Sequence, residues 1–328
     1  MHAILNINIR IGKKMHIFKP NDSILTTAGE YIQSGKLVAF PTETVYGLGA
    51  NAFDKKAVTA IFAAKERPFF DPLISHVADI DFLKEYAHTD ERTLALARHF
   101  SPGPITFVLK RKDNRASLDL ACAGLPHIAV RIPNHPVALS LIQKSGVPIV
   151  APSANKFKTV SPTTAQHVFE SLGNKVDMIL DGGACHVGVE STILDMTHKN
   201  IILLRAGGIA LEEIENFLNE KVIFQNISSS NPTAPGQLLK HYAPPKPLRI
   251  NVSVPEADEF FIGFGQMDNV HLNLSQLADL NEAAGNLFSY LRQAGNQKLF
   301  PKIAIAPIPL HGLGLAINDR IKRASHQE

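Results

Sequence analysis

Basic residues stand within or directly after apolar, strand-like runs of this chain, where they could bind anions. Lys65 and Arg67 are two residues apart in KERP, so an extended backbone would direct both side chains to one side. Arg131 interrupts the apolar run IAVRI, where a charge needs a partner, and Arg205 ends the run IILLR before a Gly-Gly turn. Such cations suit a phosphate or carboxylate site. A solvated helix end or a surface ion pair is the competing interpretation for each.

Hydroxyl and carboxylate side chains also directly follow strand-like runs. PTETVYGLGANA, residues 41–52, directly follows the strand-like run 37–40 and places a carboxylate, two threonines and a tyrosine beside glycines. Polar groups at a strand end, followed by glycines that allow close backbone approach, suit a ligand site in an open α/β sheet. A polar turn punctuated by glycine explains this stretch alone equally well.

A second polar stretch, APSANKFKTVSPTTA at residues 151–165, follows the apolar run VPIVA. Ser161 and Pro162 predict the start of a helix over residues 163–172, with Ser161 as its N-cap. Backbone N–H groups and hydroxyls at such a helix start can bind phosphate without a P-loop. Ordinary capping by Ser161 alone is the competing interpretation.

Alternating strands and helices are expected to position these residues. Strand-like runs cover 37–40, 105–110, 128–132, 147–151, 177–181, 191–196 and 201–205, and helical patterns cover 24–34, 56–65, 91–99, 135–144, 163–172 and 210–219. This alternation predicts an α/β domain with a mixed sheet. A Ser-, Pro-, Gly- and Asn-rich linker is expected at 225–247. Beyond it, a smaller α/β domain is predicted from strands at 248–253, 259–264 and 302–306 and helices at 277–293 and 314–324.

The composition excludes several classes of protein. With 45% apolar and 19% charged residues, the 328-residue chain can bury a large core and suits two domains. Its two cysteines argue against a disulfide framework, form no zinc motif and fit a reducing compartment. There is no P-loop, no GxGxxG after the first strand, and no HExxH or GxSxG. No apolar run is long enough to span a bilayer, and residues 1–15 are interpreted as an N-terminal extension rather than a signal peptide.

Taken together, these segments resemble the Sua5/YrdC family of threonylcarbamoyl-AMP synthases. Seven motifs occur in the family's order across residues 24–210: PTETVYGLGANA, KERP with DPLISH, SPGPIT, AVRIPNHP, APSAN with SPTTA, GVESTI and LLRAGGI. The tail 246–328, with HGLGLAINDRIKRA, is similar to the Sua5 C-terminal domain. The resemblance implies a YrdC-like twisted mixed sheet over residues 16–224, a linker or lid at 225–247, and a smaller Rossmann-like α/β domain over 248–328.

The resemblance also implies an activity. Members make L-threonylcarbamoyladenylate from L-threonine, bicarbonate or CO2, and ATP, and release pyrophosphate. This nucleotidyltransferase reaction is the first step of the t6A modification next to the anticodon of tRNA. It implies Mg2+ bound with ATP, a cytoplasmic location without membrane association, and downstream partners in the threonylcarbamoyl-transfer machinery and tRNA.

Residue roles follow from the same resemblance. Lys65 and Arg67 would be catalytic, within a K-x-R…S-x-N signature that Ser153 and Asn155 complete. The residues implied to hold ATP are Arg67, Asp71, Thr106, Ser153, Asn155, Ser161, Arg205 and Tyr242. The residues implied to hold threonine are Thr42 or Thr44, His76, Arg131, Ser191 and the backbone around Ala151, with Arg131 on the carboxylate. The sequence does not choose between the two threonines.

Asp71 departs from the family's pattern, which usually has asparagine before Pro-Leu. A carboxylate only accepts hydrogen bonds and repels a triphosphate unless Mg2+ intervenes, so Asp71 either ligates the metal or alters the local ATP contact. Two other functions stay open. One is an RNA-binding module, disfavoured by 7% aromatic residues and the lack of Trp. The other is a related carbamoyl-adenylate transferase that acts on another acceptor.

Overall fold

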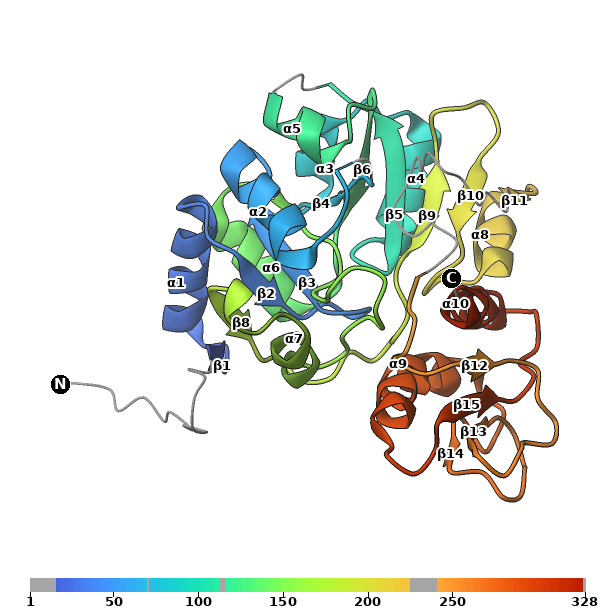
Figure 1. Cartoon of the computed structure of the whole chain (residues 1–328). Coiled ribbons are helices and arrows are strands. Elements are labelled where there is room, and N and C mark those ends of the chain that lie inside the picture. The colour runs from blue at the N-terminus through green and yellow to red at the C-terminus, as the bar shows by residue number, and fades with distance from the viewer. Residues whose placement is uncertain (1–15, 70, 113–115, 225–240, 327–328) are drawn as a thin grey trace.

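The computed structural model describes residues 16–69, 71–112, 116–224 and 241–326. Its larger part is an 11-stranded mixed sheet with helices packed around it (Figure 1). In spatial order the strands are β1 Ile17–Phe18, β8 Met178–Leu180, β2 Val38–Phe40, β3 Gly47–Asn51, β7 Ile149–Val150, β4 Ile74–His76, β6 His127–Arg131, β5 Ile105–Lys110, β9 Thr192–Asp195, β10 Ile202–Arg205 and β11 Ile223–Phe224. Parallel pairs such as β4–β6 and antiparallel pairs such as β5–β6 occur in the same sheet, which confirms the predicted mixed α/β fold.

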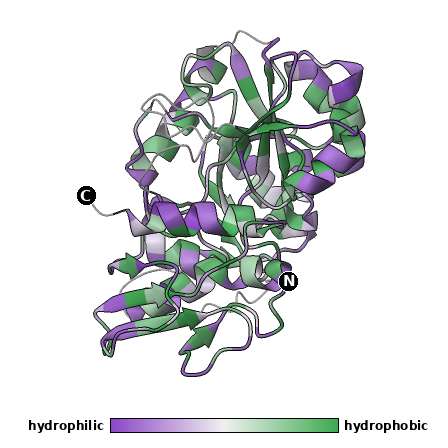
Figure 2. Cartoon of the chain, turned by 90° about the vertical axis from the view of Figure 1, so that its right-hand side faces the viewer, coloured by the Kyte–Doolittle hydropathy of each residue, from purple (hydrophilic) through white to green (hydrophobic). Residues whose placement is uncertain are grey.

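The helices of this part lie between its strands in the chain. They are α1 Asp22–Gln33, α2 Lys55–Lys65, α3 Ile80–Tyr86, α4 Glu91–Phe100, α5 Ala116–Ala121, α6 Pro136–Ser145, α7 Ala165–Leu172 and α8 Leu211–Leu218, and a 3-10 turn covers Gly173–Lys175. In Figure 2 the central strands are mainly hydrophobic, whereas the peripheral helices carry many hydrophilic residues. This distribution is expected when helices cover a buried sheet with one face and meet water with the other.

The end of α2 sets the direction of the chain before the first candidate site residue. The Asp54 side chain caps the start of this helix by accepting from the backbone N–H groups of Lys56 and Ala57. Glu66 ends it in the left-handed conformation, with φ 55°, and the Arg67 N–H donates to the Phe62 carbonyl at 3.0 Å. The backbone from Lys65 to Arg67 is therefore not extended. The extended backbone expected for these two residues was wrong, because the helix cap turns the chain between them.

The C-terminal unit, residues 248–326, contains a smaller parallel sheet. Its strands, in the order β12 Leu248–Arg249, β15 Lys302–Ile305, β13 Glu259–Gly263 and β14 Leu272–Asn273, are all parallel. Two helices, α9 Leu280–Asn296 and α10 Gly314–Ser325, accompany them. Figure 1 shows α10 on the side of this unit that faces β10 and α8 of the large sheet. This unit confirms the predicted smaller α/β element.

The two sheets share one hydrophobic core. A single cluster of buried side chains contains Val189 and Leu203 from the larger part together with Phe288 and Ile317 from the C-terminal unit. Tyr242, which lies before β12, belongs to the same cluster. The C-terminal unit is therefore packed against the large sheet through apolar side chains.

Two local expectations were wrong. The helix predicted over residues 163–172 begins at Ala165, and Thr164 rather than Ser161 is its N-cap, accepting from the His167 N–H at 3.2 Å. Ser161 is buried and donates to a carboxylate instead. Both residues precede the helix and have hydroxyls, so a local pattern cannot choose between them when one has a distant partner.

The glycines of PTETVYGLGANA lie in a strand that the sequence did not predict. Gly47 and Gly49 are part of β3, which pairs antiparallel with β2. A Cβ on Gly49 would lie 2.8 Å from the Phe40 ring and 2.9 Å from the Ile149 side chain. Gly49 therefore makes room for neighbouring core side chains, and the close approach it permits is to Phe40 rather than to a ligand.

No helix among the described residues is long and apolar enough to cross a membrane.

Candidate active site

A cavity opens where several strands of the large sheet end, and it gathers residues from most of the candidate motifs. It encloses about 560 Å³ of space, a figure that includes the open solvent at its mouth. Its walls are formed by Thr42, Val45, Gly47, Arg67, Ile74, His76, Arg131, Ala151, Pro152, Ser153, Glu190, Ser191, Arg205, His241 and Tyr242. Segments that are far apart in the chain therefore meet at one place.

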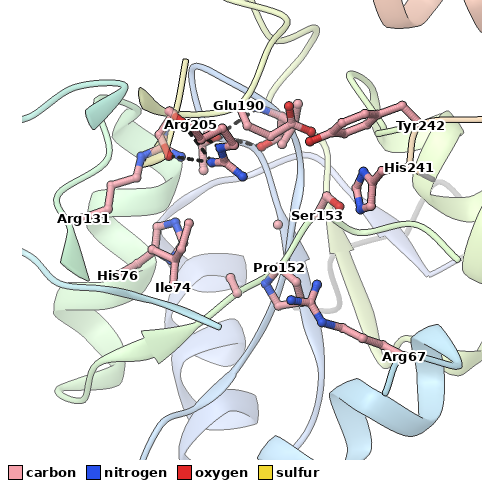
Figure 3. Close-up of a pocket in the computed structure, with 15 residues that line it drawn as sticks. Arg67, Ile74, His76, Arg131, Pro152, Ser153, Glu190, Arg205, His241 and Tyr242 are labelled. Carbon is pink, nitrogen blue, oxygen red and sulfur yellow. Dashed lines mark hydrogen bonds between the residues drawn. The ribbon is translucent and has the colours of Figure 1, made fainter. Parts of the chain in front are cut away.

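Three arginines line this cavity, with Arg131 and Arg205 near each other and Arg67 across from them (Figure 3). Arg67, Arg131 and Arg205 are 7%, 4% and 6% exposed. Guanidinium groups withdrawn from water attract anions more strongly than exposed ones, since the local dielectric is low. The cavity is therefore suited to a ligand with more than one anionic group.

Arg131, at the end of β6, is fixed by the loop after β2. Its guanidinium forms an ion pair with Glu43 at 2.8 Å and donates to the Thr44 hydroxyl at 2.9 Å. The Thr44 and Thr42 hydroxyls are 2.8 Å apart. Thr42 lines the cavity, whereas Thr44 is fully buried and is not among the lining residues.

His76 is the neighbour of Arg131 across the β4–β6 pair. Burial, and then the positive charge of Arg131, lower its pKa to about 3. The imidazole is therefore neutral at physiological pH. Its Nδ1 has no hydrogen-bond partner among the described residues, so a neutral polar group is available at the cavity wall.

Arg205, at the end of β10, is held against the residue before β9. Its Nε and Nη2 donate to the Ser191 carbonyl at 3.1 and 3.0 Å, and Nη2 also donates to the Ser191 hydroxyl at 3.1 Å. The Thr106 hydroxyl lies 2.7 Å from the Ser191 hydroxyl but behind the cavity wall. Burial lowers the pKa of Arg205 to about 10, so it stays charged at neutral pH.

Arg67 is paired with Asp71. Its Nη2 lies 2.9 Å from Asp71 Oδ2 and donates to the carbonyls of Asp71 and Pro72 at 3.2 and 2.9 Å. Burial raises the pKa of Asp71, while the charge of Arg67 opposes that shift. Asp71 does not line the cavity, so it orients Arg67 from behind.

Lys65 is placed differently from the sequence expectation. It is fully buried, does not line the cavity, and donates to the carbonyls of Ser153 and Asn155 at 2.5 and 2.6 Å. Burial, and then the charge of Arg67, hold its pKa well below the ordinary value. The Asn155 amide is also turned away from the cavity, donating to the Lys156 and Thr159 carbonyls at 2.9 Å. Both side chains therefore shape the loop that presents Ser153.

Tyr242 and its neighbour close one side of the cavity. Tyr242 is 1% exposed and stacks on Phe288 of α9, with ring centroids 5.3 Å apart. The His241 ring meets the Tyr242 ring edge to face at 4.0 Å, and burial lowers the pKa of His241 to about 3. The Ala243 N–H donates to the Lys158 carbonyl at 2.9 Å, which ties this segment to the loop before α7. Residues 225–240 of the expected linker lie outside the described residues.

Sequence reasoning assigned no site role to six wall residues, of which two are titratable, Glu190 and His241. Glu190 stands in GVESTI, and its carboxylate accepts from the Ser161 hydroxyl at 2.7 Å. Because a serine hydroxyl has one proton, Ser161 cannot donate to a ligand while this bond exists. A carboxylate between valine and serine beside glycines was a visible signal for Glu190. The sequence around Glu190 does not indicate which residue balances its charge.

The residues present fit a metal ion that is held mainly by an anionic molecule bound in the cavity. Among the described residues, no group of three or more His, Cys, Asp or Glu side chains is placed to hold a metal. Asp71 Oδ1 is buried and accepts no hydrogen bond from any described residue. A carboxylate oxygen is a ligand that Mg2+ accepts, and Mg2+ is usually bound through one or two carboxylates together with phosphates.

The fold and the cavity define an α/β protein with a site for anionic small molecules. A family model that covers Sua5, YciO and YrdC proteins, described as telomere recombination, matches residues 30–207. A second, described as the C-terminal domain of threonylcarbamoyl-AMP synthase, matches residues 209–326. The chain belongs to the Sua5/YrdC family.

Relatives and solved structures are similar over nearly the whole chain. A threonylcarbamoyl-AMP synthase of Pyrococcus abyssi is 40% identical over 91% of this chain and 93% of its own length. One of Bacillus subtilis is 37% identical over 93% and 94%. The crystal structure of P. abyssi Sua5 complexed with L-threonine has a TM-score of 0.87 and 37% identity, covering 94% of this chain and 96% of that one. E. coli YciO, with 23% identity and a TM-score of 0.51 over 60% of this chain, shares the fold of the larger part.

Proposed function

We propose that this chain is an L-threonylcarbamoyladenylate synthase. It converts L-threonine, bicarbonate and ATP into threonylcarbamoyl-AMP, pyrophosphate and water. The observation that carries this proposal is the convergence of Arg67, Arg131 and Arg205 on one cavity, in a chain similar along its length to threonylcarbamoyl-AMP synthases. The reaction joins a carboxylate, a carbamate and a triphosphate, and these anions need converging cations.

Threonine is assigned to the side of the cavity around Arg131. The guanidinium binds the amino acid's carboxylate, while neutral His76 and the Ser191 hydroxyl meet its polar groups without adding charge. Thr42, rather than Thr44, is the wall threonine in this assignment, and Thr44 acts by holding Arg131. The backbone around Ala151 forms the floor.

ATP is assigned to the part of the cavity between Arg67 and Arg205. These two arginines and the Ser153 wall face the phosphates, and Tyr242 covers the nucleotide. Lys65, Asn155, Asp71 and Thr106 act from behind the wall by holding Ser153, Arg67 and Ser191 in place. Ser161 can donate to a phosphate only after its hydrogen bond to Glu190 is released.

The chemistry needs a cation-rich, water-poor cavity more than it needs a nucleophilic side chain. The threonine amine and bicarbonate combine with loss of water, and a carbamate oxygen attacks the α-phosphorus as pyrophosphate leaves. The carbamate is unstable in water, so holding it in line with the α-phosphate shortens its exposure. Arg67 and Arg205 stabilise the charge that develops on the phosphates. Mg2+ bound with ATP would supply further charge neutralisation.

The chemistry of the product indicates which reaction must follow. Threonylcarbamoyl-AMP is an activated acyl donor, so a transfer machinery that acts on tRNA consumes it, and tRNA modification is assigned to the cytoplasm. We infer a catalytic domain over residues 16–224, a lid segment over 225–247, and a C-terminal domain over 248–328. The two separate sheets support this division, since β11 at Ile223–Phe224 still belongs to the large sheet, whereas the family models divide the chain earlier, at residues 207 and 209.

Pyrophosphate release from ATP tests the proposal. The assay contains Mg2+ and bicarbonate, with and without L-threonine, and serine serves as the matched amine control. Threonine-dependent release with much weaker release on serine is expected. Release that ignores threonine, in folded protein that binds ATP, would instead favour another acceptor amine. Salt-sensitive tRNA binding without any turnover would favour an RNA-binding module.

A further inference from the structure

An arginine of the C-terminal unit reaches the wall of the cavity. Arg320, on α10, is 0% exposed, and its Nε donates to Glu190 Oε2 at 2.9 Å. Its Nη1 donates to the Ala206 carbonyl and to Asp319 Oδ2, both at 2.8 Å. Arg320 and Glu190 are 130 residues apart in the chain. The side chain therefore crosses from the C-terminal unit into the larger part.

Glu190 is the wall residue that most needs such a partner. It is an acidic side chain within the residues that line the cavity, beside Arg205 and Ser191. Its two carboxylate oxygens are divided between the two parts of the molecule, since Oε1 accepts from Ser161 and Oε2 from Arg320. An unpaired buried carboxylate would be costly, and an ionised one would repel phosphate.

Arg320 also supports the residue that closes the cavity. Its guanidinium carbon lies 5.4 Å from the centre of the Tyr242 ring, on which Phe288 of α9 also stacks. A guanidinium at this distance from an aromatic ring is attracted to it. The C-terminal unit thus holds Tyr242 with two side chains.

We propose that Arg320 is a positioning residue of the active site, which neutralises Glu190 and holds it against Ser161 so that the cavity can accept a polyphosphate. The C-terminal unit is then a structural part of the nucleotide site and more than a support for a lid. This inference rests on the proposed function, because it takes ATP as the ligand of the cavity.

The charge of Glu190 makes the effect of losing Arg320 on ATP affinity depend on pH. Loss of an arginine with a merely structural role would not produce this dependence. The charged and titratable groups that face it are Arg320 and Asp319 from α10, Arg205 from β10, and His241 and Tyr242 from the segment before β12. Burial alone would raise the pKa of Glu190, but the charges of Arg320 and Arg205 hold it at about 2. Without Arg320 the effect of burial dominates and this pKa rises. Arg205 and the Ser161 hydroxyl still oppose this rise, so the direction of the shift, and not its size, is the signature.

The experiment compares R320Q, E190Q and the double variant R320Q/E190Q with the wild type between pH 6 and pH 8.5. ATP affinity is measured by isothermal titration calorimetry, and KM for ATP and kcat by threonine-dependent pyrophosphate release. K322A is the control, since Lys322 is an exposed cation on the same helix. R320K keeps the charge, and the double variant covers the case in which R320Q does not fold. Circular dichroism confirms folding of each variant.

We expect R320Q to raise the dissociation constant and KM for ATP by about tenfold or more at pH 8, the usual size of effect when one partner of a buried charge pair is removed. The defect is smaller at pH 6 than at pH 8, because a raised pKa increases the protonated, uncharged fraction of Glu190 at the lower pH. The double variant recovers most of the loss because glutamine is neutral at every pH, R320K falls between, and K322A matches the wild type.

Two results would overturn the inference. One is a folded R320Q with wild-type ATP affinity at both pH values or, if R320Q does not fold, a folded double variant that does not bind ATP. The other is a double variant that binds ATP no better than R320Q. A wild-type protein that binds ATP without threonine-dependent release would contradict the proposed function alone. The effect of Arg320 on ATP affinity can still be measured by calorimetry in that case. A wild-type protein that does not bind ATP would contradict both.

Discussion

At the scale of single residues, the site is built from buried charges whose partners stand behind the cavity wall. Arg131 is backed by Glu43, Arg67 by Asp71, and Glu190 by Arg320. Each pair fixes the wall member of the pair in one geometry before any ligand arrives. Such preorganisation is the main means by which a site stabilises charge that develops during a reaction.

Replacing Arg67 separates its part in chemistry from its part in stability. R67A should lower kcat/KM for ATP by about a hundredfold or more, as loss of a charge-stabilising donor usually does. It should also lower the melting temperature, because the Asp71 carboxylate loses its 2.9 Å partner. Turnover is measured by pyrophosphate release and stability by thermal unfolding.

The double variant R67A/D71N removes the unpaired carboxylate and should regain stability without regaining turnover. R98A is the matched control, since Arg98 is an exposed arginine on α4. Near-normal kinetics in folded R67A would remove Arg67 from the mechanism.

Two buried imidazoles should make the folded state sensitive to acid. The pKa values of His76 and His241 are about 3 in the folded protein, below the ordinary value near 6.5. A group whose folded pKa is depressed in this way binds more protons when unfolded between pH 3 and pH 6.5, so stability falls as the pH is lowered through that window. The loss by pH 5 is up to about 2 kcal/mol for each imidazole.

Urea unfolding at pH 7.5 and pH 5 measures this loss. Replacing His76 with asparagine should flatten the dependence, while replacing exposed His326 should not. An unfolding free energy that changes equally in wild type and the His76 variant would show that this imidazole is not buried neutral.

At the scale of elements, strand ends and helix caps decide which side chains reach the cavity. Glu66 ends α2 in a left-handed conformation, which sends Lys65 toward the loop at residues 153–155 and Arg67 toward the cavity. Strand β3 supplies the packing on which the preceding loop rests, since its glycines leave space for the Phe40 ring. The loop with Thr42 and Glu43 connects β2 to β3.

Adding one methyl group to β3 tests this packing. G49A should destabilise the protein by about 1–3 kcal/mol, because the new Cβ would be 2.8 Å from the Phe40 ring. Thermal unfolding measures the effect. A smaller side chain in F40L/G49A should recover part of the stability, and a G49A protein as stable as the wild type would mean that the hairpin adjusts freely.

At the scale of the whole molecule, the C-terminal unit and the large sheet depend on each other. They share a hydrophobic cluster, Arg292 of α9 donates to the Val160 and Ser161 carbonyls, and Arg320 is buried at their junction. An interface with buried charges and a continuous core resists separation more than a flexible domain contact does.

Removing residues 225–328 should therefore do more than weaken turnover through loss of Tyr242. The truncated chain should expose Val189 and Leu203 to water, bind a hydrophobic dye such as ANS, and unfold at a lower temperature. ATP affinity should fall as well, because Glu190 loses Arg320. A truncated chain with unchanged melting temperature and nucleotide affinity would contradict this dependence.

The sequence by itself determined the class of fold and the kind of chemistry. Period-two and helical patterns depend only on neighbouring residues, so the mixed α/β sheet and the smaller C-terminal sheet could be predicted, and the ordered motifs pointed to the family. Short elements escaped prediction, because glycine-rich β3 lacks a strand composition and is held by its partners β2 and β7.

Only the tertiary structure decided which candidates share the cavity and what stands behind them. It placed Thr42 on the wall and Thr44 behind it, gave the helix cap to Thr164 instead of Ser161, and turned Lys65 toward two carbonyls. It also joined Glu190 to Arg320 across 130 residues. Local patterns indicate which face of an element is buried, but the partner of a buried charge depends on how distant elements pack, and no local spacing records that.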